Sequence, residues 1–397
     1  MINTQRLIDI RELYGFSREK LASKLAINEQ KVIQFENGVI DPNFIAIRKL
    51  TELFSVSPDY FFNVSNIPHV AIEESLTYRT KKKRSNKSAK LDKYELKYID
   101  FIHYYIEYFN QFVTINHHDI LPIMYNISQK YKSLMTYKKR MSSMENLASE
   151  VRKKLNIKNN KKMMYILEQY GVYILEKELS SEKDAYSIWV EDTPYIVLSR
   201  RGQSEARRTF SLAHELGHLL MHHDIDISKL TIDEYNKLED EANQFASCLL
   251  LPEKEIKKDF ETINNPSDPN SYLYLKEKYH VSITAIEYRC YKLGLLGTSQ
   301  NNHFYMLLNK NKYRFNEPLD NKWALTVPGK IIYMIKFILD HCISQDKILA
   351  SNGIRSEFLN NLFCLREPLF SDKYSSSKVI KINCEKKPVD ISDYLQY

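Results

Sequence analysis

Two histidines four positions apart, His214 and His218, have the spacing that binds one metal ion from a helix. Residues four apart lie one turn apart on the same helix face, so both imidazoles can reach a single zinc ion. Glu215 projects about 100° round the helix from His214. It would therefore lie beside the metal, where a general base can take the proton of an attacking water. Residues 207–222 have apolar side chains at helical spacing and no proline, which predicts the helix that carries all three groups.

A catalytic zinc site needs a third protein ligand and one open position for water. Residues 239–252 read as a second helix, with Glu241 stacked beside Phe245 and Leu249 on its apolar face. A carboxylate on an apolar face is costly unless a cation meets it, so Glu241 is the expected third ligand. Glu239 lies about 200° away on the same helix, among the solvent-side residues, and is the alternative ligand.

The two predicted helices belong to a longer set of motifs in the same region. The set comprises a predicted strand at 194–198, the helical stretches 207–218 and 241–246, residues 249–252, and the single residues Val281, Ser282 and Arg289. Together they make residues 144–296 similar to the ImmA/IrrE metallo-endopeptidase family. The resemblance implies an α+β fold with a small sheet and a zinc ion bound by two histidines and a glutamate. It also implies a protein substrate, because members of that family include peptidases that cleave a partner repressor in a stress or mobile-element response.

In the mechanism that these parts imply, zinc polarises the scissile carbonyl, and Glu215 deprotonates the water and later carries the proton to the leaving amine. If the strand at 195–198 is a sheet edge beside the site, it would hold an extended substrate by strand addition. His222 and His223 are expected to be solvated at a helix end, with an oxyanion role as the alternative. The alternative for the whole domain is a non-catalytic sensor in a transcription factor.

Residues 4–62 have apolar side chains at helical spacing interrupted by short turns, which predicts four or five short helices. Ser17 is an expected helix N-cap, and Asn28 is expected to cap a second short helix with Val32 and Phe35 facing inward. Two helices joined by so short a turn place the second one for insertion in a major groove. This stretch resembles the Xre-type helix-turn-helix family. The resemblance lies in residues 16–22, 32–38, Pro42, Leu50 and residues 53–54.

The Xre-type resemblance implies base contacts from Gln30, Lys31 and Gln34 and a backbone contact from Arg18. Glutamine can bond adenine with two hydrogen bonds, and lysine can donate to guanine. Two features depart from the family: Arg18 stands where members often carry glutamine, and Glu29 would repel phosphates. The alternative is a helical module used only for dimerisation or docking.

Residues 79–93 carry eight lysines and arginines against one acid, which predicts a solvated linker that either tracks DNA phosphates or is a plain tether. A long helix is expected next, with aromatic and apolar residues spaced three and four apart: Leu91, Tyr94, Tyr98, Phe101, Tyr105, Tyr108 and Phe112. This seam would serve a homodimer that reads a palindrome. Four further apolar residues widen it and favour ordinary core packed on the domain that follows: Ile99, Ile102, Ile106 and Phe109.

A chain of 397 residues is too long for one ordinary core, so we expect a multidomain protein. The expected parts are an all-α helix-turn-helix domain at 1–66, the basic linker and long helix at 67–140, an α+β zincin-like metallopeptidase domain at 141–300 and a mostly helical extension at 301–397. Within the extension we expect a strand at 303–308 and helices at 331–343 and 348–362, packed on the peptidase domain.

Cysteine usage and the N-terminus bear on the compartment. The five cysteines are odd in number and never form a C-x-x-C pair, which argues against a disulfide framework or a cysteine zinc site. The N-terminus has no apolar leader, and no apolar run reaches the length of a membrane span. We therefore expect a cytoplasmic protein whose partners are a double-stranded DNA operator and a protein substrate. The net charge of +7 fits DNA binding but carries little weight alone.

Overall fold

The computed structural model describes residues 1–72, 76–78, 93–115, 118–179, 184–314, 316–371 and 388–392. The chain forms two compact units. Unit 1 contains Met1–Glu73, Lys90–Asn116 and Gly329–Tyr397, and unit 2 contains Glu74–Ala89 and His117–Pro328. This division differs from the expected four parts, because the segments expected as linker and as C-terminal extension are each shared between the two units.

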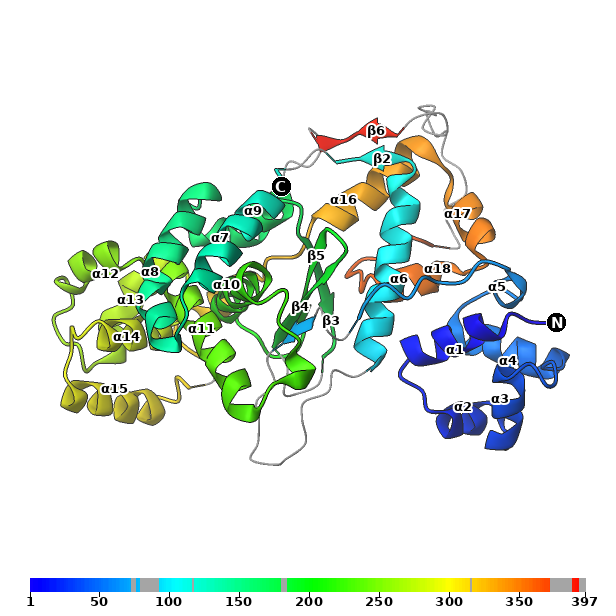
Figure 1. Ribbon diagram of the computed structural model, residues 1–397, viewed down its shortest axis with the longest axis horizontal. Coiled ribbons are helices and arrows are strands. Elements are labelled where there is room, and N and C mark those ends of the chain that lie inside the picture. The colour runs from blue at the N-terminus through cyan, green and yellow to red at the C-terminus, as the bar shows by residue number, and fades with distance from the viewer. Residues whose placement is uncertain are drawn as a thin grey trace. The chain divides into compact units, whose positions relative to one another are not determined.

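Five short helices open unit 1 (Figure 1): α1 (Thr4–Leu13), α2 (Arg18–Leu25), α3 (Glu29–Glu36), α4 (Phe44–Phe54) and α5 (Asp59–Phe62). The Ser17 side chain accepts a hydrogen bond from the Lys20 amide, and the Asn28 side chain accepts one from the Lys31 amide, so both N-caps form as expected. Between them, Ala26 adopts a left-handed conformation that ends α2. The result is the predicted pair of helices joined by a tight turn.

Helix α6 (Lys93–Asn110) is the central helix of unit 1, with most of its side chains buried. It packs against α1, α16 (Lys330–Phe337) and α18 (Ser356–Leu362). The π-helix η6 (Ile338–Cys342) and α17 (Gln345–Asn352) complete this group. The described residues of the aromatic seam of α6 are buried or half-buried, so the seam contributes to the core of unit 1, and its first member, Leu91, lies outside the described residues. The partners of α6 within unit 1 are α1 and the C-terminal helices.

The turn between α17 and α18 packs directly on the helix-turn-helix segment. The Ser57 amide donates to the Gly353 carbonyl at 2.9 Å, and the Arg355 amide donates to the Ser55 carbonyl at 3.0 Å. Gly353 has a φ of 64°, and a Cβ there would lie 2.6 Å from the Tyr60 nitrogen, so a side chain is excluded on both grounds. This junction places the C-terminal helices in unit 1, which corrects the expectation that they pack on the peptidase domain.

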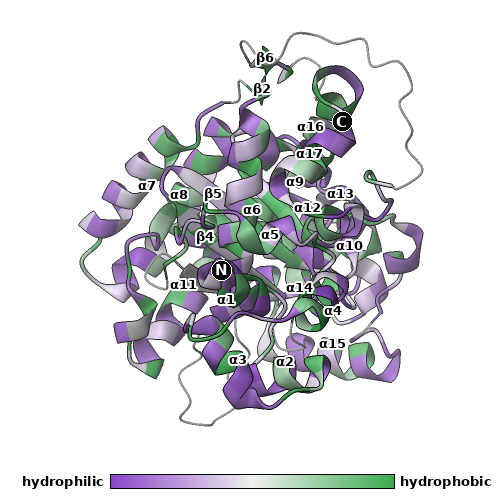
Figure 2. Cartoon of the chain, turned by 90° about the vertical axis from the view of Figure 1, so that its right-hand side faces the viewer, coloured by the Kyte–Doolittle hydropathy of each residue, from purple (hydrophilic) through white to green (hydrophobic). Residues whose placement is uncertain are grey.

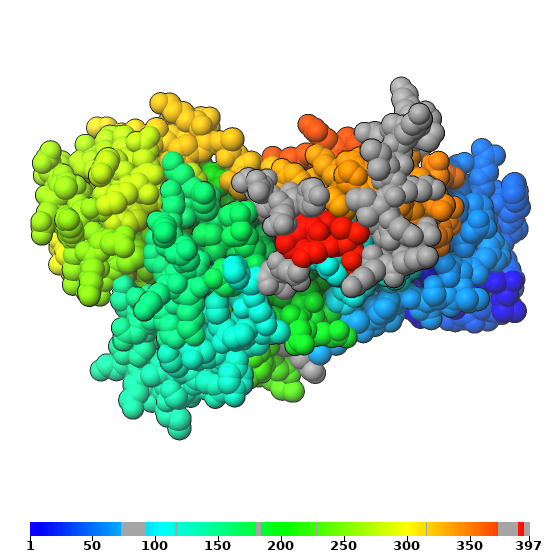
Figure 3. Space-filling model, turned by 90° about the horizontal axis from the view of Figure 1, so that it is seen from above, coloured from blue at the N-terminus to red at the C-terminus, as the bar shows by residue number. Residues whose placement is uncertain are grey.

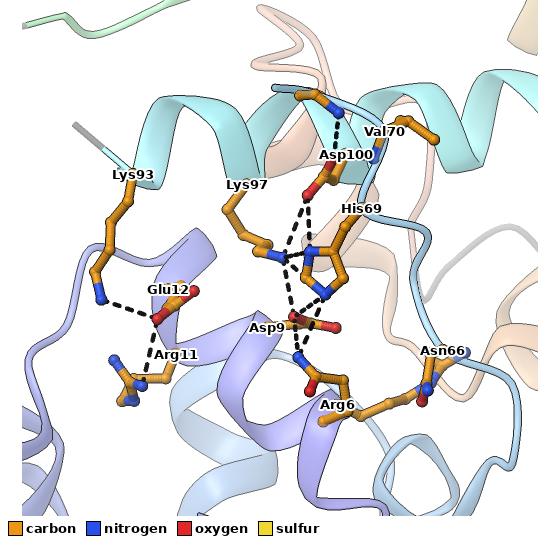
Figure 4. A network of polar contacts seen from close by, with 12 residues as sticks. Arg6, Asp9, Arg11, Glu12, Asn66, His69, Val70, Lys93, Lys97 and Asp100 are labelled. Atoms are coloured by element: carbon orange, nitrogen blue, oxygen red, sulfur yellow. Dashed lines mark hydrogen bonds and ion pairs between the residues drawn. The ribbon is translucent and has the colours of Figure 1, made fainter. Parts of the chain in front are cut away.

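A buried polar network also joins α1 to α6 within unit 1 (Figure 4). The Lys97 Nζ lies 3.0 Å from Asp9 Oδ1 and 3.2 Å from Asp100 Oδ2. The His69 ring reaches the same two carboxylates at 3.4 Å. Asp100 also accepts the Val70 amide at 2.9 Å. Removing one partner of such a buried set leaves a charge unpaired, so the network fixes α6 against the helix-turn-helix segment.

Unit 2 contains a four-stranded sheet in the order β1-β4-β5-β3, made of β1 (Leu76–Tyr78), β3 (Tyr173–Lys177), β4 (Ala185–Val190) and β5 (Thr193–Ser199). Strand β5 pairs in parallel with β3 and antiparallel with β4. It is therefore an interior strand, which corrects the expectation that it is a sheet edge. Both of its hydrogen-bonding sides are used, so β5 cannot add a substrate strand. The edge beside β4 is taken by β1, with Thr77 opposite Ser187.

Helices α9 and α10 pack on this sheet, and α12 to α15 lie away from it (Figure 1). The helices of unit 2 are α7 (Leu121–Ser133), α8 (Tyr137–Lys154), α9 (Met163–Gln169), α10 (Glu205–Met221), α11 (Ile232–Leu250), α12 (Glu253–Phe260), α13 (Leu273–Tyr279), α14 (Ile283–Lys292) and α15 (Thr298–Lys310). Short 3-10 turns connect them: η2 (Asn160–Lys162), η3 (Ile227–Lys229), η4 (Pro269–Tyr272) and η5 (Asp320–Lys322). Hydrophobic and hydrophilic residues alternate around the helices in Figure 2, as expected where one face of each helix is buried.

The strand expected at 303–308 is part of α15. Its buried residues, Phe304 and Leu308, are four positions apart, which is the period of a helix and not of a strand.

Strands β2 (Val113–Thr114) and β6 (Val389–Asp390) pair in parallel in unit 1, and β6 lies at the surface in Figure 3. Among the described cysteines, Cys248, Cys290 and Cys364 form no disulfide, but Cys342 is disulfide-bonded, which departs from the expected absence of disulfides. Separations along the sequence could not reveal this pairing. Within the described ranges, no helix is long and apolar enough to cross a membrane.

Candidate metal centre and DNA-facing helix

Helix α10 carries the two histidines as expected and begins at the N-cap Ser204. His214 and His218 are each 1% exposed, and their Nε2 atoms lie 3.1 Å apart. Helix α11 packs on α10 and brings Glu239 to the same point: Oε1 lies 3.4 Å from His218 Nε2, and Oε2 lies 3.6 Å from His214 Nε2. One ligand atom from each of the three residues lies within 4.8 Å of the other two. Two imidazoles and one carboxylate fit zinc and leave a fourth position open.

The carboxylate that lies beside the two histidines is that of Glu239, the alternative ligand, and the preferred candidate Glu241 is not part of this group. Glu241 is fully buried, as the apolar face predicted. The cation that meets it is Arg140 from α8, whose Nε lies 2.7 Å from Glu241 Oε1. The Glu239 side chain is 14% exposed, as suits a site that must admit water and substrate. The position of Glu241 on an apolar helix face predicted that a cation lies beside its carboxylate, but it did not identify that cation as Arg140.

Neighbouring side chains orient the two imidazoles. His214 Nδ1 lies 3.1 Å from Asn243 Oδ1. Because that oxygen accepts, the proton belongs on Nδ1, which leaves the Nε2 lone pair for a metal. Tyr235 donates to Glu239 at 2.9 Å. Burial alone would raise the pKa of Glu239, but His218 and His214 outweigh burial and lower the pKa to about 2. The carboxylate is therefore ionised at neutral pH, as a zinc ligand must be.

Glu215 is 1% exposed and faces the sheet. Ser187 on β4 donates a hydrogen bond from Oγ to Glu215 Oε2 at 2.7 Å. Strand β4 thus fixes the orientation of the Glu215 carboxylate. Gly217 allows α10 and α11 to approach, because a Cβ there would lie 2.9 Å from Phe245 Cδ1. This close approach is what lets a residue of α11 reach the histidines of α10.

His222 is completely buried at the end of α10, which corrects the expectation of a solvated histidine. Its Nδ1 lies 2.9 Å from His218 Nδ1, and its Nε2 lies 3.4 Å from Glu241 Oε2. Burial lowers the pKa of His222 to about 4. His222 is therefore a neutral histidine beside the candidate ligands. Glu241 also accepts a hydrogen bond from Tyr131 at 2.5 Å.

Several residues around the centre were not found by sequence reasoning: Ser187, Asn243, Tyr131 and Arg140. Asn243 lies inside the Glu-Ala-Asn-Gln-Phe-Ala stretch, so the motif contained a signal for it. The other three lie 28 to 110 positions from their partners, and no local pattern marks them. They are brought in only by the packing of β4, α7 and α8.

The expected recognition helix, α3, presents polar residues to solvent. Gln30 and Lys31 are exposed, and Gln34 is half-buried. Val32 and Phe35 point into the core, as the spacing predicted. The exposed face of α3 therefore carries the three side chains expected to read bases, together with the exposed Glu29.

Arg18 forms an ion pair with a buried acid. Its Nε lies 2.6 Å from Glu36 Oε2, and its side chain remains 43% exposed. Glu36, whose side chain is fully buried, also bonds Arg11 Nε. A hydrogen bond to Glu36 raises the pKa of Arg18. Arg18 is thus held in place at the start of α2, with part of its guanidinium at the surface for the expected phosphate contact.

Comparisons with known families match two parts of the chain. The family model described as helix-turn-helix matches residues 7–61, and the one described as IrrE N-terminal-like domain matches residues 167–291. No curated protein matches the chain. The first range begins within α1 and ends within α5, and the second holds the sheet strands β3 to β5 with α10 and α11. The chain is thus a fusion of an Xre-type helix-turn-helix domain with an ImmA/IrrE-type metallopeptidase domain.

Proposed function

We propose that this protein is a transcriptional regulator whose second domain is an active zinc-dependent endopeptidase that cleaves a partner repressor in a stress or mobile-element response. The observation that supports the peptidase part is the convergence of His214, His218 and Glu239, with the buried Glu215 on the same helix between the two histidines. A double-stranded operator is the proposed DNA partner. Both partners would be met in the cytoplasm.

A zinc ion held by the three ligands would polarise the scissile carbonyl and lower the pKa of the attacking water. Glu215 takes the proton of that water and later delivers it to the leaving amine. Ser187 keeps the Glu215 carboxylate in one orientation through its 2.7 Å hydrogen bond. Asn243 keeps His214 in the tautomer that ligates metal through Nε2.

The outer edge of β4 is the proposed position for an extended substrate. Strand β4 supplies Ser187, the partner of Glu215, so its edge passes beside the proposed base. Main-chain hydrogen bonds along an edge hold a peptide without reading its side chains. Residues of β1 already take this position. A substrate strand that binds here must therefore displace β1.

Replacing Glu215 with glutamine should nearly abolish cleavage. Wild-type protein loaded with zinc and mixed with co-encoded repressor candidates should yield a discrete fragment by mass spectrometry. Glu215→Gln keeps the shape of the side chain but cannot accept the proton, so the rate should fall by roughly 10²- to 10⁴-fold. Glu255→Gln, on the exposed face of α12, is the matched control and should cut at the wild-type rate.

The sensor alternative has a different outcome in the same experiment. If no fragment appears with any co-encoded protein, and if wild type and Glu215→Gln control genes equally in the cell, the domain is a non-catalytic sensor. Both alternatives predict bound zinc, so zinc content alone does not separate them.

A second candidate substrate is the chain itself. Leu76–Tyr78 lies antiparallel to β4, with Thr77 opposite the serine that holds Glu215. The basic segment 79–93, where we expect the accessible cleavage point, follows directly, and all of it except Lys93 lies outside the described residues. Cleavage there would separate the helix-turn-helix domain from the peptidase domain. Zinc-loaded protein that stays intact on ageing would remove this candidate.

Gln30 and Lys31 should carry operator discrimination. Replacing both with alanine removes a bidentate partner for adenine and a donor for guanine. For each of these base contacts, the preference for the operator over random duplex should fall by roughly 1 to 3 kcal/mol. Titrations at one salt concentration measure both affinities. Lys24→Ala removes the same charge from the exposed surface of α2 and should weaken both duplexes equally. Unchanged discrimination in the double variant would refute the assignment of α3.

A further inference from the structure

We propose that Tyr131 and Arg140 are positioning residues for the metal centre, acting through Glu241 and His222 on the ring of His218. This inference rests on the proposed zinc site. It adds the helices α7 and α8, which lie outside the range 167–291 matched by the IrrE-like family model, to the parts that shape the site.

The first step is the contact between two imidazoles. His218 turns Nε2 toward Glu239 and His214, and its Nδ1 lies 2.9 Å from Nδ1 of His222. Two ring nitrogens at this distance form a hydrogen bond, so one of them must carry a proton and the other must accept it. Because a metal ligand must leave Nε2 bare, His218 carries its proton on Nδ1 and donates it to His222. His222 then carries its own proton on Nε2.

The second step is the acid that faces His222. The Nε2 of His222 lies 3.4 Å from Glu241 Oε2, at ion-pair distance. His222 and Glu241 are both completely buried, so no bulk water competes for either group. The Nε2 atom of His222 makes no hydrogen bond, but the negative charge of Glu241 lies on its side of the ring and favours the proton on that nitrogen. This leaves Nδ1 of His222 to accept from His218.

The third step is what holds Glu241. Tyr131 donates to Oε2 at 2.5 Å, and Arg140 donates from Nε to Oε1 at 2.7 Å. The Arg140 guanidinium also lies over the Tyr131 ring, 5.3 Å from its centroid. The Tyr131 ring meets the His222 ring edge to face at 5.2 Å. Tyr131 therefore fixes both Glu241, by a hydrogen bond, and His222, by ring contact.

The geometry explains why α11 carries two glutamates two positions apart. Glu239 reaches the histidines from one side of α11, and Glu241, about 200° away, supports His218 indirectly from the other. Partners of metal-bound histidines fix the ring and its tautomer, and their loss typically lowers metal affinity by about 10- to 100-fold. Glu241 is thus a support for a ligand and not a ligand.

The test uses the full-length protein and five variants, of which two, Arg140→Lys and Arg140→Gln, change the cation at Glu241. Tyr131→Phe removes only the hydroxyl that meets Glu241, and His222→Ala removes the link to His218. Tyr137→Phe is the matched control, because Tyr137 donates to the neighbouring acid Asp240 at 3.4 Å. Zinc affinity is measured by chelator competition, the ligand field by the visible spectrum of the cobalt-loaded protein, and the fold by thermal unfolding of the metal-free protein.

We expect zinc to bind about 10-fold more weakly to Tyr131→Phe and up to about 100-fold more weakly to His222→Ala. Both variants should also have an altered cobalt spectrum, and Tyr137→Phe should match wild type in both readouts. Arg140→Lys, which keeps a cation at Glu241, should be closer to wild type than Arg140→Gln. A purely structural role for Tyr131 would lower the unfolding temperature without changing the cobalt spectrum.

Two outcomes overturn the inference and are distinguishable. Wild-type zinc affinity and an unchanged cobalt spectrum in both Tyr131→Phe and His222→Ala would refute the positioning role and leave the proposed function intact. A wild-type protein that binds no zinc would refute the proposed function and the positioning role together.

Discussion

Glu239→Gln is expected to lose zinc on dialysis, whereas Glu241→Gln is expected to keep about one zinc ion per chain when zinc is in excess. The reason is geometric. The Glu239 carboxylate lies within 3.6 Å of both histidine Nε2 atoms. Glu241 is bonded instead to Tyr131 and Arg140. Glu239→Gln leaves only the two histidines, which are too few ligands to hold zinc. Glu241→Gln keeps all three ligands and only weakens the support of one of them.

The measurement is metal content by mass spectrometry together with a chelator titration. Because glutamine is isosteric with glutamate, both variants should fold, and metal-free unfolding curves check this. Activity should disappear in Glu239→Gln at any zinc concentration and return in Glu241→Gln as zinc is raised. The reverse result, with zinc lost only from Glu241→Gln, would restore Glu241 as the ligand and would contradict the packing of α11 that brings Glu239 to the histidines.

The second large effect is on the stability of unit 1. Glu36→Ala is expected to destabilise the helix-turn-helix segment by about 3 to 5 kcal/mol, because it leaves Arg11 buried without its partner. The Arg11 side chain is 4% exposed, and that of Glu36 is 0% exposed. The same change also releases Arg18, so DNA affinity should fall even at temperatures where the unit is folded.

Two optical signals separate the units in this experiment. Both tryptophans, Trp189 and Trp323, belong to unit 2. Denaturant unfolding followed by far-ultraviolet circular dichroism should therefore gain an early phase in Glu36→Ala, while the tryptophan fluorescence transition stays in place. Glu52→Ala is the matched control, because Glu52 pairs with Arg48 on the exposed surface of α4. Surface pairs of this kind contribute only about 0.3 to 0.5 kcal/mol. Equal shifts in the two variants would contradict the prediction.

Local spacing in the sequence determined the parts whose partners are close along the chain. The helix that carries His214, Glu215 and His218 follows from a period of four residues, and the N-caps Ser17 and Asn28 follow from their position before apolar helical runs. The helix-turn-helix pair was predicted for the same reason, because the spacing of apolar residues marks both of its helices. The α+β class of the second domain was instead implied by the resemblance to the ImmA/IrrE family.

Other features depended on which element packs against which. The sequence showed that Glu241 faces inward, but whether zinc or Arg140 compensates it depends on the position of α8, 101 residues earlier in the chain. Strand β5 has the composition of any buried strand, and only the pairing of β3 and β4 on its two sides makes it interior. The C-terminal helices carry ordinary apolar faces, so the sequence could not say that α6 would cover them.

The triplet in α10 shows the same division. The sequence determined that two histidines and a glutamate share one helix, because a helix sets their separation by itself. Only the tertiary structure decided that Glu239 completes the group, that Ser187 holds Glu215 and that His222 is buried behind His218. Hydrogen bonds and ion pairs between distant segments depend on distances of a few ångströms in the packed chain, and a one-dimensional pattern does not contain them.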